Sequence, residues 1–261
     1  MYTMGVDIGS ASSKVVILKD LKLFDSEVVQ IGTGTKGPSI AVEEIFKRTG
    51  LSYESMERVV VTGYGRFTFE EADEQISEIS CHAKGIHFLI PDARTIIDIG
   101  GQDAKAIALD SSGIVKQFFM NDKCAAGTGR FLDVMARVLN VELSEMQEID
   151  KRSKNPVTVS STCTVFAESE VISQLSKGAP IEDIIAGVHN SVAHKVCGLA
   201  FRAGLKDTIV MCGGVAKNSG VVRAISEELK RDIRVADMPQ ITGALGAAIF
   251  AYERAMKTKE A

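Results

Sequence analysis

The chain has 261 residues, of which 45% are hydrophobic and 25% charged, and its formal net charge is −4. This charge excludes the basic footprint of a nucleic-acid-binding protein, and the longest apolar run, residues 244–252, is too short to cross a bilayer. The five cysteines form no C-x-x-C pair, which argues against a zinc ribbon or a thioredoxin motif. Because the first residues lack the basic segment of a signal peptide, we expect a cytoplasmic protein.

An eight-residue pattern occurs twice in the chain. Residues 7–14 (DIGSASSK) and 98–105 (DIGGQDAK) both read D-I-G-x-x-x-x-K, and each follows an apolar run. Such a repeat predicts two related halves, each presenting a strand, a glycine turn and a second strand to one ligand. Glycine lets the backbone approach a phosphate, small hydroxyl residues supply donors, and the aspartate can hold a metal ion. The alternative is a pair of ordinary glycine-turn hairpins.

Each half is expected to open with three strands and to continue with helices that alternate with single strands. The expected strands are 3–8, 14–18, 26–31, 58–62, 95–99, 104–109, 114–119 and 208–212. The expected helices are 40–49, 77–89, 129–139, 166–176, 181–203, 219–229 and 243–256. This order predicts an α/β protein of two domains with mixed sheets flanked by helices. Their expected bounds are residues 1–92, closed by helix 243–257, and residues 93–242, which carry Cys124 and Cys163.

A third glycine element follows the last expected strand. In residues 210–218 (VMCGGVAKN), Gly213 and Gly214 would let a base and sugar lie against the backbone, and Asn218 is expected to cap the next helix. Taken alone, a simple strand-to-helix turn explains the segment equally well. Together with the repeat and residues 242–246 (TGALG), its order resembles the actin, sugar-kinase and Hsp70-type ATPase superfamily. The Walker sequence and G-x-G-x-x-G are absent, which excludes P-loop and Rossmann folds.

Two cysteines lie among small and polar residues directly before expected helices. Cys124 falls in residues 121–131 (NDKCAAGTGRF) and Cys163 in residues 160–170 (SSTCTVFAESE). A helix N-terminus favours a thiolate and stabilises an anionic iron–sulfur cluster. A cubane cluster commonly needs about four thiolates, which a two-fold dimer could supply on its axis. The alternatives are two buried structural cysteines or, less favoured in a reducing compartment, a disulfide.

The motifs together resemble a known family. Residues 7–14, 61–66 (VTGYGR), 98–105, 121–133, 160–175, 211–218 and 242–248 are similar to the ATP-dependent activators of 2-hydroxyacyl-CoA dehydratases and to the ATPase subunits of benzoyl-CoA reductase. The resemblance implies an actin-like (ribonuclease H-like) ATPase fold with internal duplication and one ATP per subunit. It also implies a homodimer sharing one [4Fe–4S] cluster, with Cys124 and Cys163 as its ligands. In the first loop this chain has Ala11-Ser12 where the family has Thr-Ala.

We interpret the chain as an ATP-driven one-electron reductase that activates an iron–sulfur dehydratase. The resemblance implies ferredoxin or flavodoxin as the electron donor. Asp7, Asp98 and Asp103 are candidates for holding Mg²⁺ through water or for positioning the attacking water, which Gln102 could orient. The expected nucleotide contacts are Ser10, Ala11, Ser12, Ser13, Lys14, Gly101, Gln102, Gly213, Gly214, Asn218 and Gln240.

Alternative interpretations remain at this stage. The same fold could serve a small-molecule kinase, and the partner could instead be a double-cubane-cluster or benzoyl-CoA reductase-type enzyme. Cys81, His82 and His87 could bind a metal, although packing explains them better. Tyr64 and Arg66 lie in a glycine-rich segment that is either a simple turn or a partner-facing element.

Overall fold

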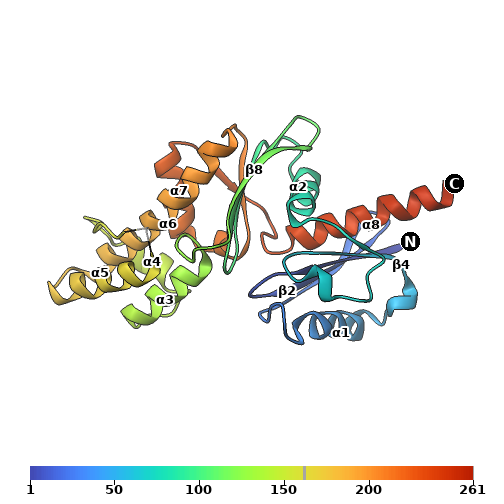
Figure 1. The fold of residues 1–261 in the computed structure, drawn as a ribbon, viewed down its shortest axis with the longest axis horizontal. Coiled ribbons are helices and arrows are strands. Elements are labelled where there is room, and N and C mark those ends of the chain that lie inside the picture. The colour runs from blue at the N-terminus through green and yellow to red at the C-terminus, as the bar shows by residue number, and fades with distance from the viewer. Residues whose placement is uncertain (161–162, 261) are drawn as a thin grey trace. The chain divides into compact units, whose positions relative to one another are not determined.

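A computed structural model describes residues 1–160 and 163–260 of the chain. The chain divides into two compact units, which are coloured along the sequence in Figure 1. Unit 1 comprises Met1–Ala93, Leu109–Lys116 and Ala236–Ala261, and unit 2 comprises Arg94–Ala108 and Gln117–Val235. Among the described residues, no helix combines the length and apolar character needed to span a membrane.

The two sheets have the same strand order. The first sheet runs β3-β2-β1-β4-β5, and the second, read from its far edge, runs β8-β7-β6-β9-β10. Antiparallel pairs (β1 with β2, β6 with β7) and parallel pairs (β1 with β4, β6 with β9) correspond as well. The internal duplication expected from the repeated D-I-G pattern is therefore confirmed. The strand bounds are Tyr2–Ile8 (β1), Ser13–Lys19 (β2), Lys22–Val29 (β3), Met56–Thr62 (β4), Glu74–Gln75 (β5), Thr95–Ile99 (β6), Ala104–Leu109 (β7), Val115–Asn121 (β8), Ile209–Cys212 (β9) and Ile233–Val235 (β10).

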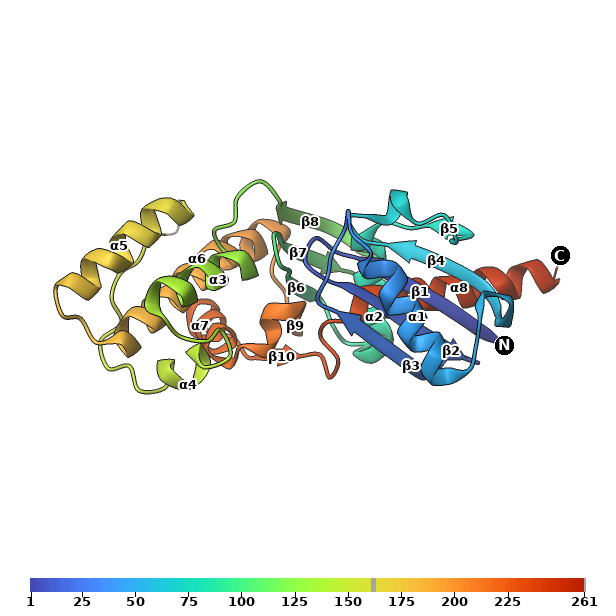
Figure 2. The same ribbon diagram turned by 90° about the horizontal axis from the view of Figure 1, so that it is seen from below.

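Helices cover both faces of the unit 1 sheet, as Figure 2 shows for α1 (Gly37–Thr49) and α8 (Thr242–Glu260). Successive side chains of a strand point to opposite faces. Accordingly, Val15 and Ile17 of β2 pack in the cluster that contains α1 residues, whereas Val16 and Leu18 pack against α8. The strand reads as one continuous apolar run because both of its faces are buried.

Unit 2 is built around a long helix, α6 (Ile181–Ala203), which is buried around most of its circumference. A helix that is apolar on nearly all sides is typical of a core position. The helices that share its hydrophobic cluster are α3 (Gly129–Leu139), α4 (Met146–Asp150), α5 (Thr164–Ser176) and α7 (Ser219–Leu229).

Most expected elements agree with the structure, and the differences have local causes. The bounds expected for β6, β7, α3, α6 and α7 are confirmed. Strand β3 begins at Lys22 rather than at residue 26, because it is an edge strand that leaves Leu23 and Phe24 exposed and so lacks a clear alternation. Strands β5 and β10 and helix α4 were not predicted, since segments this short carry no readable period.

Glycines allow two helices of unit 1 to touch backbone to backbone. Helix α2 (Glu78–Leu89) packs against α8 (Figure 1). A Cβ atom on Gly85 would overlap the carbonyl oxygen of Thr242, and one on Gly246 would overlap the carbonyl oxygen of Cys81. No side chain fits at these positions without moving a helix.

A buried polar network joins three helices of unit 2. Asn218 Oδ1 accepts hydrogen bonds from the N–H groups of Gly220 and Val221, so its Nδ2 points toward His189 Nε2, 3.3 Å away. The imidazole Nε2 then accepts, which leaves the proton on Nδ1, 3.4 Å from Asp150 Oδ2. Arg223 Nη2 lies 3.0 Å from Asp150 Oδ1. Burial raises the pKa of Asp150, but His189 and Arg223 outweigh burial and leave the pKa below its ordinary value of 3.8.

We predict opposite effects for two glycine-to-alanine substitutions in helix interiors. Gly246→Ala should lower the free energy of unfolding by about 2 kcal/mol, because the new methyl group meets backbone that cannot retreat. Gly198→Ala should raise it by about 0.5 kcal/mol, since that position of α6 has open space around it and alanine favours the helix. Urea unfolding of both variants measures the difference. Equal stability of the two variants would contradict the assigned packing of α2 on α8.

We further predict that Asp150 stabilises unit 2 in a pH-dependent way. Because its native pKa is depressed, its contribution is present above the ordinary pKa of 3.8 and is lost as the pH falls through the lower native value. Asp150→Asn should therefore cost about 2 kcal/mol at pH 7, and the gap to the wild type should close in acid. Asp207→Asn, which alters an exposed pair with Arg231, should change little. Urea titrations at several pH values test both statements, and a gap that is independent of pH would refute the first.

Candidate nucleotide and cluster sites

The first D-I-G turn joins β1 to β2 around a buried ion pair. Asp7 and Lys14 are partners in the strand register, and Lys14 Nζ lies 3.3 Å from Asp7 Oδ2. The turn closes with the Gly9 N–H donating to the Ser12 carbonyl at 3.0 Å. A Cβ atom on Gly9 would stand 2.8 Å from Lys14 Nζ, so a side chain there would displace the lysine head group.

The tip of this turn presents backbone donors. In the part of the chain that the structure describes, the N–H groups of Ser10, Ala11 and Ser12 have no hydrogen-bond partner. Consecutive N–H groups of this kind form a concavity suited to an anion. The Ser13 hydroxyl, by contrast, donates to the Ile31 carbonyl at 2.8 Å and is fully buried.

Asp7 also fits a role beside a hydrated cation. The residue is 2% exposed, and its Oδ1 atom has no hydrogen-bond partner among the described residues. A buried carboxylate oxygen without a donor is costly. A Mg²⁺ ion or its water would satisfy this atom.

The second D-I-G turn repeats the geometry in unit 2. The Gly100 N–H donates to the Asp103 carbonyl at 2.9 Å, and Lys105 Nζ lies 3.2 Å from Asp98 Oδ2. Lys105 also lies 2.8 Å from Asp103 Oδ2 and is only 1% exposed. Lys105 was not among the residues predicted from the sequence, although its place as the second lysine of the repeat marked it.

The second turn is bonded directly to the start of helix α3. The Gly129 N–H donates to the Gly100 carbonyl at 2.9 Å, and the Arg130 N–H donates to the Gly101 carbonyl at 2.7 Å. The first N–H groups of a helix have no partner within it. Here the turn supplies the acceptors, so a shift of either element is transmitted to the other.

The Gly-Gly element lies against Asp98. Gly213 has a φ of +84°, and a Cβ atom there would overlap Asp98 Oδ1 and the Ile99 carbonyl oxygen. Cys212 Sγ lies 3.6 Å from Asp98 Oδ1. The expected cap of α7 by Asn218 is confirmed. Unit 2 therefore brings Asp98, Gly213 and Gly214 to one place.

The loop that carries Cys124 is held by its own motif. Asn121 Nδ2 donates to the carbonyls of Cys124 and Ala126 at 2.8 and 3.0 Å. Thr128, the N-cap of α3, donates its hydroxyl to the Ala125 carbonyl at 2.6 Å. Gly127 takes a φ of +84° against Lys195. The polar residues of the motif thus fix the backbone and leave the Cys124 thiol partly exposed.

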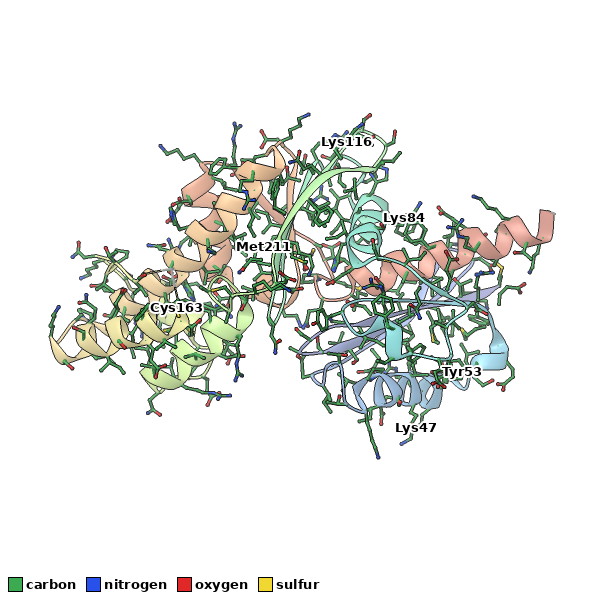
Figure 3. All side chains as sticks on the ribbon, viewed as in Figure 1. Lys47, Tyr53, Lys84, Lys116, Cys163 and Met211 are labelled. Atoms are coloured by element: carbon green, nitrogen blue, oxygen red, sulfur yellow. The ribbon has the colours of Figure 1, made fainter. Side chains whose placement is uncertain are left out.

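Cys163 is the N-cap residue of α5, where Figure 3 labels it. Its side chain is partly exposed. Ser161 and Thr162 of the same motif lie outside the described residues. Directly before these two residues, the Ser160 N–H donates to the Glu170 carboxylate.

The other three cysteines are buried. Burial raises the pKa of the Cys81 and Cys197 thiols to about 12, and Cys212 is fully enclosed. His82 Nδ1 lies 2.9 Å from the Thr242 hydroxyl. Cys124 and Cys163 are thus the two partly exposed thiols among the five cysteines.

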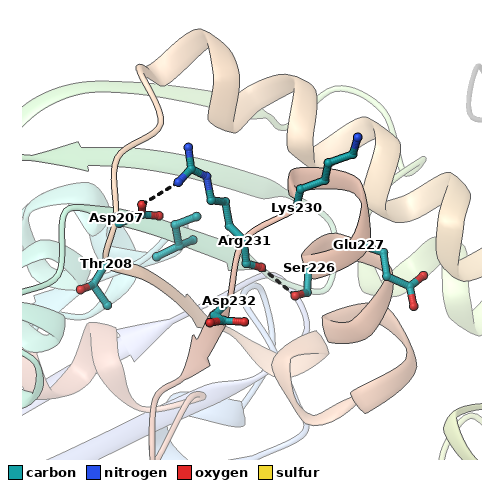
Figure 4. A pocket seen from close by; sticks show the side chains of 8 residues that line it. Asp207, Thr208, Ser226, Glu227, Lys230, Arg231 and Asp232 are labelled. Atoms are coloured by element: carbon teal, nitrogen blue, oxygen red, sulfur yellow. Dashed lines mark hydrogen bonds and ion pairs between the residues drawn. The ribbon is translucent and has the colours of Figure 1, made fainter.

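Two residues predicted from the sequence, Gln102 and Gln240, remain to be placed in the fold. Gln102 is exposed in the second turn, and Gln240 is half-buried just before α8 in unit 1. A pocket of about 600 Å³ (Figure 4) lies at the start of β9, the opposite end of that strand from Gly213. It contains none of the residues predicted from the sequence; its lining is Asp207, Thr208, Ile209, Ser226, Glu227, Lys230, Arg231 and Asp232.

Comparison with known proteins found relatives that are similar in sequence and in structure. The activator of lactoyl-CoA dehydratase from Anaerotignum propionicum is 65% identical over 258 residues, covering 98% of this chain and 100% of that protein. The structure of the activator of the 2-hydroxyisocaproyl-CoA dehydratase from Clostridium difficile with bound ADPNP matches with a TM-score of 0.96 at 57% identity, covering 100% of this chain and 97% of that one.

A ROK family glucokinase from Streptomyces griseus matches with a TM-score of 0.58 at 13% identity, covering 97% of this chain and 100% of that one, and shares the fold alone. The expected actin-like fold is thereby confirmed, as is the resemblance that the motifs indicated. The BadF/BadG/BcrA/BcrD ATPase family model matches residues 4–251. The chain belongs to the BadF/BadG/BcrA/BcrD ATPase family.

Proposed function

We propose that this protein is an ATP-dependent activator of a 2-hydroxyacyl-CoA dehydratase, delivering single electrons to an iron–sulfur partner. The observation that carries the proposal is the bonding of the second D-I-G turn to helix α3, just after the Cys124 loop. The second D-I-G turn and the loop of the candidate redox ligand Cys124 thus both adjoin the start of helix α3. The similarity to dehydratase activators points to the same function.

The nucleotide would bind through both turns and the Gly-Gly element. The free N–H groups of Ser10, Ala11 and Ser12 would hold phosphate oxygens, and Lys14 would neutralise them while remaining next to Asp7. Ser13 would contribute to nucleotide binding from its position at the base of the turn. Contacts to the rest of the nucleotide would come from Gly101, Gln102, Gly213, Gly214, Asn218 and Gln240.

Hydrolysis would use the buried acids. Asp7, Asp98 and Asp103 would hold hydrated Mg²⁺ or position the attacking water, and the exposed Gln102 would orient it. ATP binding would close residues 1–92 with helix 243–257 against residues 93–242. The Gly100 and Gly101 carbonyls would then carry the motion into α3.

The cluster would be a [4Fe–4S] centre shared by a homodimer. Cys124 and Cys163 of each copy would supply its four thiolates, since these are the accessible thiols of the chain. When bound, the cluster would supply one-electron transfer between ferredoxin or flavodoxin and the dehydratase. Asn121 and Thr128 would hold the Cys124 backbone in place, and the protein would act in the cytoplasm.

We expect Cys124→Ala and Cys163→Ala to abolish iron binding, because each leaves two thiolates at the dimer axis. Iron analysis of anaerobically purified protein should give about four irons per wild-type dimer and almost none in either variant. Cys81→Ala, Cys197→Ala and Cys212→Ala serve as controls that keep iron. Loss of iron from one of these controls together with its retention in Cys163→Ala would overturn the ligand assignment.

Lys14→Ala and Asp103→Asn should each lower the rate of ATP hydrolysis about a hundredfold, equal to roughly 3 kcal/mol of transition-state stabilisation. The first loses phosphate neutralisation, and the second loses the carboxylate that also holds Lys105. Phosphate release under saturating MgATP measures the effect, with Asp207→Asn as the control. If Asp98→Asn and Asp103→Asn both retained full activity, the second turn would have no part in hydrolysis.

A further inference from the structure

The segment from Gly63 to Thr68 exposes large apolar side chains to an unusual degree. Tyr64 is 69% exposed and Phe67 is 70% exposed, the highest values for large hydrophobic residues among those the structure describes. Exposed aromatic side chains that lie together mark interaction sites more often than scattered single ones. Nothing in the hydrolysis of ATP requires two aromatic rings in solvent.

The segment is rigid. Gly63 adopts a φ of +91°, and the Thr68 hydroxyl donates to the Gly65 carbonyl at 2.9 Å. The next residue, Phe69, is buried in the hydrophobic cluster that includes α1. The two rings are therefore presented by a fixed backbone, which reduces the entropy lost when a partner binds.

Arg66 completes the surface. Its guanidinium lies 4.2 Å from the centroid of the Phe67 ring, and its Nη1 donates to the Gly63 carbonyl at 3.0 Å. In the described part of the chain it forms no ion pair with a carboxylate. A stacked, preorganised guanidinium without an acidic partner is suited to an incoming carboxylate.

The segment is also fastened to the first nucleotide turn. The Gly65 N–H donates to the Ile8 carbonyl at 2.8 Å. A Cβ atom on Gly63 would overlap Asp7 Oδ1, and one on Gly65 would overlap the Thr33 hydroxyl. Thr33 in turn donates its N–H to the Gly9 carbonyl at 2.9 Å. Any partner that holds this segment therefore acts on the loop that we assign to the phosphates.

We propose that Tyr64, Arg66 and Phe67 form a docking projection for the dehydratase, binding an apolar depression of that enzyme beside a carboxylate. Tyrosine and arginine dominate binding energy at protein interfaces, and interface cores are enriched in aromatic residues. Small-ligand sites are concave, whereas these rings stand out in solvent, so a protein surface suits them better than a nucleotide base. The inference rests on the proposed function and adds the partner-binding surface that the proposed function leaves undefined.

The test is activation of purified lactoyl-CoA dehydratase from Anaerotignum propionicum by increasing concentrations of the intact, cluster-loaded protein. The variants are Tyr64→Ala, Phe67→Ala and Arg66→Glu, and Phe88→Ala is the control because Phe88 is exposed in the same unit. Each variant should need at least about tenfold more protein for half-maximal activation. ATP hydrolysis without dehydratase and the iron content should equal those of the wild type.

The outcomes separate the possibilities. Unchanged half-maximal concentrations in all three variants would overturn the docking role. A raised KM for ATP without dehydratase would instead assign the rings to the nucleotide, and a shift to monomer in sedimentation would assign them to a contact between copies; either result refutes the proposal. If the wild-type protein hydrolyses ATP but does not activate the dehydratase, the proposed function fails and the docking partner fails with it.

Discussion

A buried aspartate paired with a lysine on the neighbouring antiparallel strand organises each half of this protein. Asp7 faces Lys14 and Asp98 faces Lys105, at the same place in two sheets of the same order. A carboxylate inside a protein is very costly unless a cation or donor accompanies it. The pairing thus fixes the strand register, and the register fixes the glycine turn between the paired residues.

The two copies have diverged around this shared pair. The first turn has N–H groups at its tip that bond to no other described residue, and its lysine side chain remains 13% exposed. In the second turn Lys105 is 1% exposed, a further acid, Asp103, lies beside it, and the turn carbonyls are taken up by α3. One copy is therefore suited to binding an anion, and the other to placing acids and transmitting motion. This difference follows from the residues between the aspartate and the lysine.

The path from the second turn to the Cys124 loop is short and made of strong contacts. Two backbone hydrogen bonds reach α3, and its N-cap, Thr128, donates to the carbonyl of the residue after Cys124. Helix α3 packs against α5, which begins after Cys163. Coupling needs a contiguous set of contacts that can be shifted by a ligand. The residues of unit 2 alone form such a contiguous set of contacts.

The sequence by itself determined the features that depend on neighbours along the chain. The repeated D-I-G pattern predicted the duplication, periodicity predicted the long helices and central strands, and local chemistry predicted the cap by Asn218. The candidate nucleotide residues and cysteines were also named from motifs, since turns and helix starts are local structures. Short elements such as β5 and β10 could not be predicted, because two or three residues carry no readable hydrophobic period.

Only the tertiary structure decided which groups meet and which remain in solvent. The network of Asp150, His189 and Arg223 joins three helices, and no spacing in the sequence encodes that contact. The structure likewise separated two accessible cysteines from three buried ones, and it left Tyr64 and Phe67 exposed in a segment whose motif alone reads as a turn. Burial and long-range contact depend on how elements pack in space, whereas a motif specifies only the backbone nearby.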